Sequence, residues 1–229
     1  MSKSNTFENE YLLLVFNNAN IANIGDATGL RGSSAAGNLH VALHTADPGE
    51  AGDQTASEVS YTGYGRVAVP RTAGGWTVSG NQVINAGLIT FGQRTNAGTT
   101  QATHWSVGVA GSGASKIINK APLGTSIQGP FTAAVSDTIT IPGHTLAVDD
   151  RVAFYPAFGS SLPTGITEGT LYWVKTIATD TITISATQGG ATLDITGVGD
   201  GVCIKATVLD IGINITPEFQ AGQLVIQED

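Results

Sequence analysis

The histidines are the first residues in this sequence that could carry out chemistry. His40 and His44 are four positions apart, a spacing that brings two metal ligands together on a helix. Their neighbours alternate apolar and polar, and on a strand the two side chains would share a face about 13 Å apart. We therefore interpret both as surface or core histidines. His104, which precedes Trp105, is interpreted as structural, and His144, after a Pro-Gly turn, is expected to be exposed.

Three aspartates are the next candidates, because Ca²⁺ binds several hard oxygens supplied by a loop. Asp149 and Asp150 are adjacent, and Asp137 precedes them in the same region. The sequence has no D-x-D-x-D-G loop around them. A pair of aspartates at the start of a strand is typical of a solvated turn, so no metal site is predicted.

Cys203 is the only cysteine in the sequence, so an intrachain disulfide is excluded. Its neighbours Val202 and Ile204 favour a buried thiol over a reactive one. The sequence also lacks a G-x-S-x-G elbow, a Walker loop, a dinucleotide glycine fingerprint and an H-E-x-x-H helix. We therefore predict no catalytic residues, no cofactor and no enzymatic activity.

Charge and composition narrow the set of partners. The chain has 10 Lys and Arg against 18 Asp and Glu, a net charge of −8, whereas binding to phosphates requires clustered cations. No nucleic-acid partner is expected. The apolar run 11–16 is too short to cross a bilayer, and no signal-peptide pattern begins the sequence. We expect no membrane association and synthesis in a cytoplasm. Only 12% of the residues are charged, against about 25% in ordinary globular proteins, which is typical of virion and extracellular β proteins.

The elements that must hold these residues are strands. Leu39, Val41 and Leu43 alternate with polar or small residues before an Asp-Pro-Gly turn, which predicts a half-buried strand. Three further short strands, separated by Gly, Pro and Asn, are predicted at 66–69, 76–78 and 88–91. Short strands at such intervals indicate an all-β sandwich, with Trp76 and Trp105 as core anchors.

One short helix is predicted before the strands. Asn5 with Glu8 three positions later has capping-box character, and apolar residues fall on one face of a helix from about Thr6 to Asn17. A helix this short is marginal in water, so it must pack on its own sandwich or on a neighbouring subunit. The segment 17–38 is rich in Asn, Gly, Ala and Ser, which indicates irregular structure.

The second half of the chain contains another group of predicted strands. Asp137-Thr-Ile-Thr-Ile-Pro142 alternates strictly, and four more strands follow at 149–154, 171–175, 180–185 and 191–196. Five strands in about 70–75 residues are enough for a small independent domain. After them, 206–214 alternates and 222–226 supplies a last strand. We infer that 130–205 is inserted in a loop of the first domain.

The predicted fold class is therefore all-β, a jelly-roll-like antiparallel β-sandwich with a short N-terminal helix and an inserted small β-barrel or sandwich. The predicted organisation is an N-terminal arm at 1–38, a sandwich formed by 39–129 together with 206–229, and an inserted domain at 130–205.

Several separated motifs occur in an order that resembles a known family. LHVALHTADPGEAG is followed by EVSYTGYGRVAV, GGWTV, NAGLITFGQ and THWSVGVA. This order resembles a family of tailed-bacteriophage virion proteins labelled tail fibre or head decoration proteins. The similarity covers roughly residues 5–127 and, more weakly, 207–229. The segment 130–205 resembles a small β module of phage structural proteins, through DTITIPGH, DDRV, LPTG, YWV and DTITIS.

The resemblance implies a structural protein on the outer surface of a tailed-phage virion. Its leading form is a capsid decoration or cement protein, a homotrimer that contacts the major capsid protein and copies of itself. The arm or a loop would then cross to a neighbour, and the inserted module would project outward.

Two alternatives remain. The first is a tail, collar or fibre component, although the sequence lacks the heptads and long repeats of a shaft. The second is a module that binds or cleaves a host-surface glycan, in which Tyr61, Tyr64, Tyr172 and Trp173 would form a stacking platform and acidic pairs would hydrolyse the glycoside. A core role for most of these aromatics is the simpler interpretation.

Overall fold

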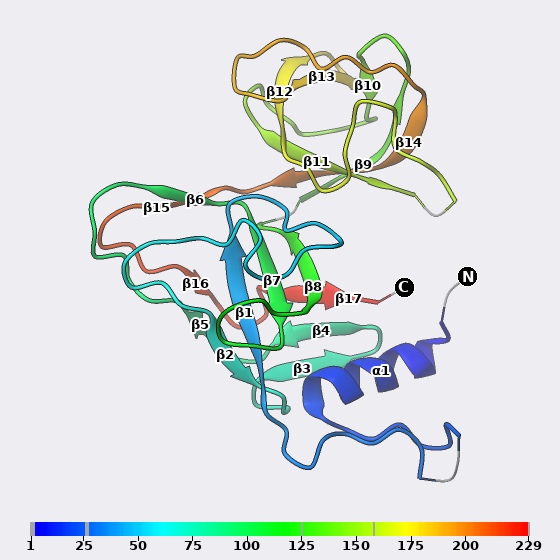
Figure 1. Ribbon diagram of the computed structural model, residues 1–229. Helices are drawn as coiled ribbons and strands as arrows, with labels where there is room; N and C mark the ends of the chain where they lie inside the picture. The colour runs from blue at the N-terminus through cyan, green and yellow to red at the C-terminus, as the bar shows by residue number, and fades with distance from the viewer. Residues whose placement is uncertain (1–2, 26–27, 125, 158, 229) are drawn as a thin grey trace.

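Antiparallel strands dominate the computed structural model, which describes residues 3–25, 28–124, 126–157 and 159–228 (Figure 1). The one helix in this part of the chain packs on a body of small sheets, and a closed barrel stands beside the body. The predicted all-β class, with a short N-terminal helix and a small barrel, is confirmed. The jelly-roll connectivity and the division into domains stay predictions.

The helix α1 spans Asn5–Asn17. Ser4 is its N-cap, because the Ser4 side chain accepts a hydrogen bond from the Phe7 amide at 3.4 Å. The predicted cap at Asn5 is therefore wrong by one residue. Glu8, assigned to the capping box, is instead buried. The helix ends at Asn18, whose φ of 57° is left-handed and stops the helical repeat.

This helix packs on its own body. Its buried face carries Leu12 and Phe16, and it lies against β3 (Trp76–Ser79) and β4 (Gln82–Asn85). The sequence left two possible packing partners for the helix, and in the structure it packs on the chain's own sandwich. The described residues that follow, 18–25 and 28–37, are mostly irregular, as predicted, and a bridge joins Ile21 to Leu30.

The largest open sheet of the body has β1 (Asn38–His44) near its centre. The strand order is β2 (Val67–Pro70), β1, β7 (His104–Gly108) and β8 (Ile117–Pro122). All neighbours are antiparallel, and Leu43 of β1 lies opposite Trp105 of β7. Five of the seven residues of β1 and all five of β7 are buried, so both faces of these strands are covered.

The end of the chain completes the body by pairing with strands from its first half. These pairs are β15 (Leu209–Ile211) with β6 (Thr100–Ala102), β16 (Glu218–Phe219) with β5 (Ile89–Thr90), and β17 (Val225–Gln227) with β4. Lys3 and Glu228 form an ion pair at 2.8 Å. The two ends of the described chain therefore meet on the body.

The barrel is closed by six strands in the order β10-β13-β12-β11-β14-β9. Their bounds are β9 Ser126–Ala133, β10 Ile139–Thr140, β11 Arg151–Pro156, β12 Tyr172–Ile177, β13 Thr181–Ser185 and β14 Gly199–Ala206. The predicted strand at 191–196 is wrong, since this segment is irregular. It still buries Ile195, whose amide donates to the Asp137 side chain at 2.7 Å instead of to a strand.

Each half of the molecule has its own apolar core. The body core contains Trp76 and Trp105, which confirms their prediction as anchors. In the barrel core, Phe131 meets Phe154 edge-to-face with ring centroids 5.0 Å apart. The connections into and out of the barrel run side by side, since the Thr207 amide donates to the Leu123 carbonyl at 2.8 Å.

Candidate functional site

A serine and a histidine meet inside the body in the arrangement of a nucleophile and its base. His44 Nε2 lies 2.7 Å from Ser106 Oγ, and His44 Nδ1 lies 2.9 Å from the Ala56 carbonyl. Because a carbonyl only accepts, Nδ1 carries the proton and Nε2 accepts from Ser106. Sequence reasoning missed this pair, because β1 and β7 bring the two residues together only in the folded sheet.

This pair has no route to a substrate. His44 and Ser106 are both 0% exposed. Gln54 Nε2 also donates to Ser106 Oγ at 3.1 Å and to the His40 carbonyl at 2.9 Å. These hydrogen bonds satisfy buried polar groups, so the network holds the sheet to the loop that carries Gln54. His44 is a core histidine, one of the two interpretations given above.

His104 is structural, as predicted, and it contacts the barrel. Its Nδ1 lies 2.9 Å from Thr103 Oγ1, and its Nε2 donates to the Gly169 carbonyl at 3.1 Å. Burial lowers the pKa of His104 to about 4, so the ring is neutral near pH 7. His144 is half-buried, with a buried Nε2. The prediction of an exposed His144 is therefore wrong, because the turn that carries it folds back on the barrel.

The three aspartates do not converge on one point. Asp137 accepts from the Ile195 amide, while Asp150 accepts from the Ala147 amide at 2.7 Å and pairs with Lys205 at 2.7 Å. Within the described ranges, no group of three or more His, Cys, Asp or Glu residues is arranged to hold a metal ion.

The four aromatics proposed as a stacking platform are divided between the two halves of the molecule. Tyr61 is buried in the body core with Tyr64 packed against that core, and Tyr172 is buried in the barrel core. The Tyr61 hydroxyl donates to the Gly92 carbonyl at 2.8 Å. These three tyrosines are packing residues, so the joint platform is wrong. Trp173 is half-exposed and carries Arg151 over its ring.

Cys203 lies within β14 and is completely buried. Burial raises the pKa of its thiol to about 12. The thiolate that nucleophilic chemistry or metal binding needs is therefore disfavoured, in agreement with the interpretation of Cys203 as a buried residue of the core.

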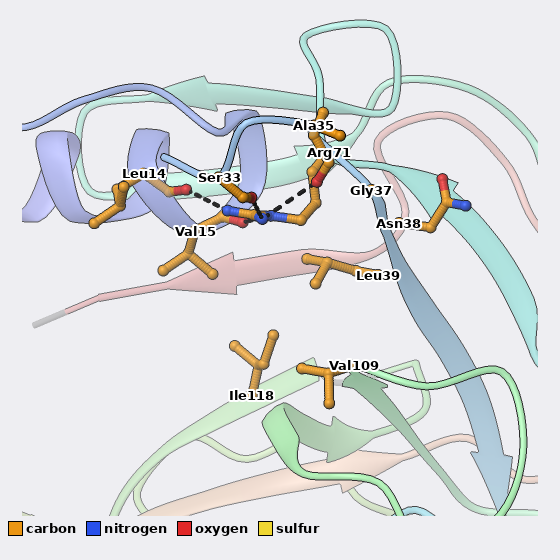
Figure 2. Close-up of a pocket in the computed structure, with 11 residues that line it drawn as sticks. Leu14, Val15, Ser33, Ala35, Gly37, Asn38, Leu39, Arg71, Val109 and Ile118 are labelled. Carbon is orange, nitrogen blue, oxygen red and sulfur yellow. Dashed lines mark hydrogen bonds between the residues drawn. The ribbon is translucent and has the colours of Figure 1, made fainter. Parts of the chain in front are cut away.

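One cleft lies between the end of α1, the segment 33–39 and the edge of the sheet that contains β1 (Figure 2). Its volume is about 410 Å³ and its lining is mainly apolar, including Leu39, Val109 and Ile118. The one cation in the lining is Arg71. Its guanidinium donates to the Leu14 and Val15 carbonyls at 2.8 and 2.7 Å, and also to Ser33 Oγ and the Ala36 carbonyl. Arg71 therefore closes the C-terminal end of the helix, and its position is set by structural contacts.

A smaller cleft, of about 190 Å³, opens where the body meets the barrel. The body contributes Thr45, Ala46, Asp47, Thr103 and His104, and the barrel contributes Arg151, Thr170 and Leu171. We call it the junction cleft. Sequence reasoning missed it, because its residues come from distant parts of the chain. The only signal was the Asp-Pro-Gly turn after the first strand, which was interpreted as a turn alone.

Asp47 is the acidic group of the junction cleft. Lys120 Nζ donates to both Asp47 carboxylate oxygens, at 2.9 and 3.1 Å, and the Gly49 amide donates to one of them. Burial opposes ionisation of Asp47, but these hydrogen bonds hold its pKa below the ordinary value. Asp47 is thus a carboxylate with a nearby counter-charge.

The fold is β-rich, and the Ser106–His44 pair that resembles catalytic groups is buried in the body. Among the residues described, no helix is long and apolar enough to cross a bilayer. The family model of podophage GP4 fiber I protein gp80 matches residues 2–149, more than half of the chain, and the chain belongs to this family. No curated protein matches the sequence.

Membership in this family confirms the coarser prediction, a bacteriophage virion structural protein. The match covers the helix, the body up to β8 and the first two strands of the barrel. Capsid decoration and trimerisation stay predictions.

Proposed function

We propose that this chain is a structural subunit of a fibre-type appendage on the outer surface of a podophage virion, without enzymatic activity. The observation that carries the proposal is the match of residues 2–149 to a podophage fibre protein family. The structure supports this role, since it is β-rich and its buried Ser106–His44 pair has no access to a substrate.

We propose that the body attaches the subunit to the virion and that the barrel is an inserted domain projecting from it. Both ends of the described chain lie on the body, where Lys3 pairs with Glu228. The entry to the barrel at Leu123 and the exit at Thr207 are hydrogen-bonded to each other. A domain inserted between two adjacent chain ends leaves the parent fold intact. This arrangement supports the predicted division into 1–38, 39–129 with 206–229, and 130–205.

A capsid decoration protein is the second candidate. The observation that favours it is the shape of the fold, because the described chain forms two compact units with a single 13-residue helix, and no elongated shaft. A trimer of such units on the major capsid protein would stabilise the head through many repeated contacts of about 1,600 Å² each. The helix packs on its own body, so a loop rather than α1 would reach the neighbouring subunit.

Copy number and location in purified particles separate the two candidates. Quantitative mass spectrometry would compare this chain with the major capsid protein, and gold-labelled antibodies against the barrel would locate it in electron micrographs. A fibre subunit is expected in far fewer copies than the capsid protein, with label at the tail. Near-equal copy numbers and label over the whole head would reject the fibre role in favour of decoration. Absence of the chain from particles would reject both.

A further inference from the structure

Arg151 is a half-buried cation that lacks an anionic partner within the described ranges. The five ion pairs found there do not include it, and its Nε atom is buried without a hydrogen-bond partner. The guanidinium lies over the ring of Trp173, 4.4 Å from the ring centroid. Burial lowers the pKa of Arg151. Because Nε is buried, the donors that a ligand could reach are Nη1 and Nη2, for which the described chain supplies no acceptor either.

The side chain lines the junction cleft, where other polar groups surround it. Thr45, Thr103 and Thr170 line the same space, and Asp47 lies on its body side. His104 is also in the lining, but its ring is already engaged by Thr103 and the Gly169 carbonyl. The cleft therefore presents one unpaired guanidinium, hydroxyl groups that can accept and donate, and one carboxylate that can only accept.

The volume of the junction cleft limits the ligand. At about 190 Å³ it is smaller than the roughly 300–1,000 Å³ of pockets for drug-sized ligands. One small group fits in such a space. An arginine with free donors is suited to a planar carboxylate, which it can bind through two parallel hydrogen bonds.

Asp47 narrows the ligand class further. A doubly charged phosphate would place two negative charges near this carboxylate, against one for a carboxylate ligand, and the carboxylate of a protein side chain carries no hydroxyl that could donate to it. A uronic acid carries both a carboxylate for Arg151 and hydroxyl donors for Asp47. Lys120 neutralises Asp47 from the other side, which reduces its repulsion of the sugar carboxylate.

We propose that the junction cleft binds a single uronic acid unit of an acidic polysaccharide, with Arg151 pairing to the carboxylate and Asp47 and the threonines binding the hydroxyls. This inference goes beyond the structural role and does not depend on it. Binding is measured on the isolated full chain, whereas the structural role is tested in particles.

Isothermal titration calorimetry would compare four probes on the full chain. D-glucuronate and D-galacturonate are the acidic sugars, D-galactose is the neutral control, and acetate is a carboxylate without hydroxyls. We expect at least one uronate to bind at least tenfold more tightly than galactose and acetate. Absence of uronate binding, or equal binding of uronate and galactose, would overturn the proposal. Equal binding of acetate would also overturn it, because a general carboxylate site would then explain the data.

Substitutions of Arg151 test whether this residue is responsible for the binding. Arg151→Gln is expected to weaken uronate binding at least tenfold, and Arg151→Lys, which keeps the charge but not the fork of donors, to weaken it less. The matched control is Arg31→Gln, which removes the charge of an exposed arginine outside the cleft and should leave binding unchanged. Unfolding curves establish that each variant is folded. Wild-type affinity in a folded Arg151→Gln protein would reject the site.

Discussion

Phe16 and Trp76 pack edge-to-face, with ring centroids 5.1 Å apart and an angle of 65° between the planes. Phe16 comes from α1 and Trp76 from β3, and both are almost completely buried. This contact joins the N-terminal helix to the body. A helix of 13 residues is marginal by itself, so its stability depends on such packing.

Replacing Phe16 should therefore weaken the packing of the helix on the body. Phe16→Ala is expected to lower the free energy of unfolding by about 3–5 kcal/mol, measured by urea denaturation, and to reduce the helical signal in circular dichroism. Leu14→Ala is the matched control, because Leu14 is on the same helix but only half-buried. If the two variants lost equal stability, the Phe16–Trp76 contact would not be what holds the helix.

Glu58 and Arg66 form an ion pair that should contribute more than the surface pairs. Arg66 donates to both Glu58 carboxylate oxygens at 2.8 Å, and its side chain is 2% exposed. Glu58→Gln is expected to cost about 1.5–3 kcal/mol, because a charged donor loses its acceptor. Glu50→Gln serves as the control. Glu50 also pairs with a cation, Lys120, but its side chain is 88% exposed, so the loss should be at most about 1 kcal/mol. Urea denaturation would measure the free energy of unfolding of both variants, and comparable losses in the two would contradict this ranking.

Stability should decrease in mild acid because of His104. Its folded pKa of about 4 lies below the ordinary 6.5, so between these values the unfolded chain binds a proton that the folded chain does not. The free energy of unfolding must then fall as the pH drops from about 6.5 towards about 4. Over the whole interval this amounts to at most about 3–4 kcal/mol.

His104→Gln should reduce this pH dependence while keeping a donor for the Gly169 carbonyl. Urea unfolding at about pH 7.5 and about pH 5 would be compared for the two proteins. Burial also lowers the pKa of His44, so a smaller slope of the same sign is expected to remain in the variant. An unchanged slope would mean that His104 is not the titrating group.

Cys203 offers a probe of the barrel alone, since it is the only cysteine and is buried in β14. The native chain is expected to react with a thiol reagent at mildly alkaline pH far more slowly than the urea-unfolded chain, because the thiol is inaccessible and its pKa is raised to about 12.

Labelling at intermediate urea concentrations also tests the proposed inserted domain. The emission of Trp76 and Trp105 reports mainly on the body, although Trp173 in the barrel also contributes. If the barrel is an independent domain, exposure of Cys203 and the main fluorescence change should occur at different urea concentrations. Coincident transitions would show that the body and the barrel unfold as one unit.

Local sequence patterns were sufficient to predict most of the strands. The alternation at Leu39, Val41 and Leu43 corresponds to β1, and the Asp137–Pro142 repeat contains β10. They failed at 191–196, where Leu193 and Ile195 also alternate with polar residues. The Leu193 amide donates to the Ile184 carbonyl of β13 at 2.8 Å, but the Ile195 amide donates to the Asp137 side chain, so the strand pairing does not continue. Alternation reports which side chains are buried, and it does not report which group takes the backbone hydrogen bond.

The sequence by itself determined the all-β class, the short helix, the burial of Trp76, Trp105 and Cys203, and the phage virion family, because burial patterns, turn residues and ordered motifs are local properties. Only the tertiary structure decided which residues meet. In the folded chain Ser106 is buried beside His44. The guanidinium of Arg94 donates to several acceptors, which include the Ile211 carbonyl at 3.0 Å. Arg151 lies unpaired at the junction cleft. These relationships join residues far apart in the chain, and strand pairing, which brings them together, is fixed only when the whole fold closes.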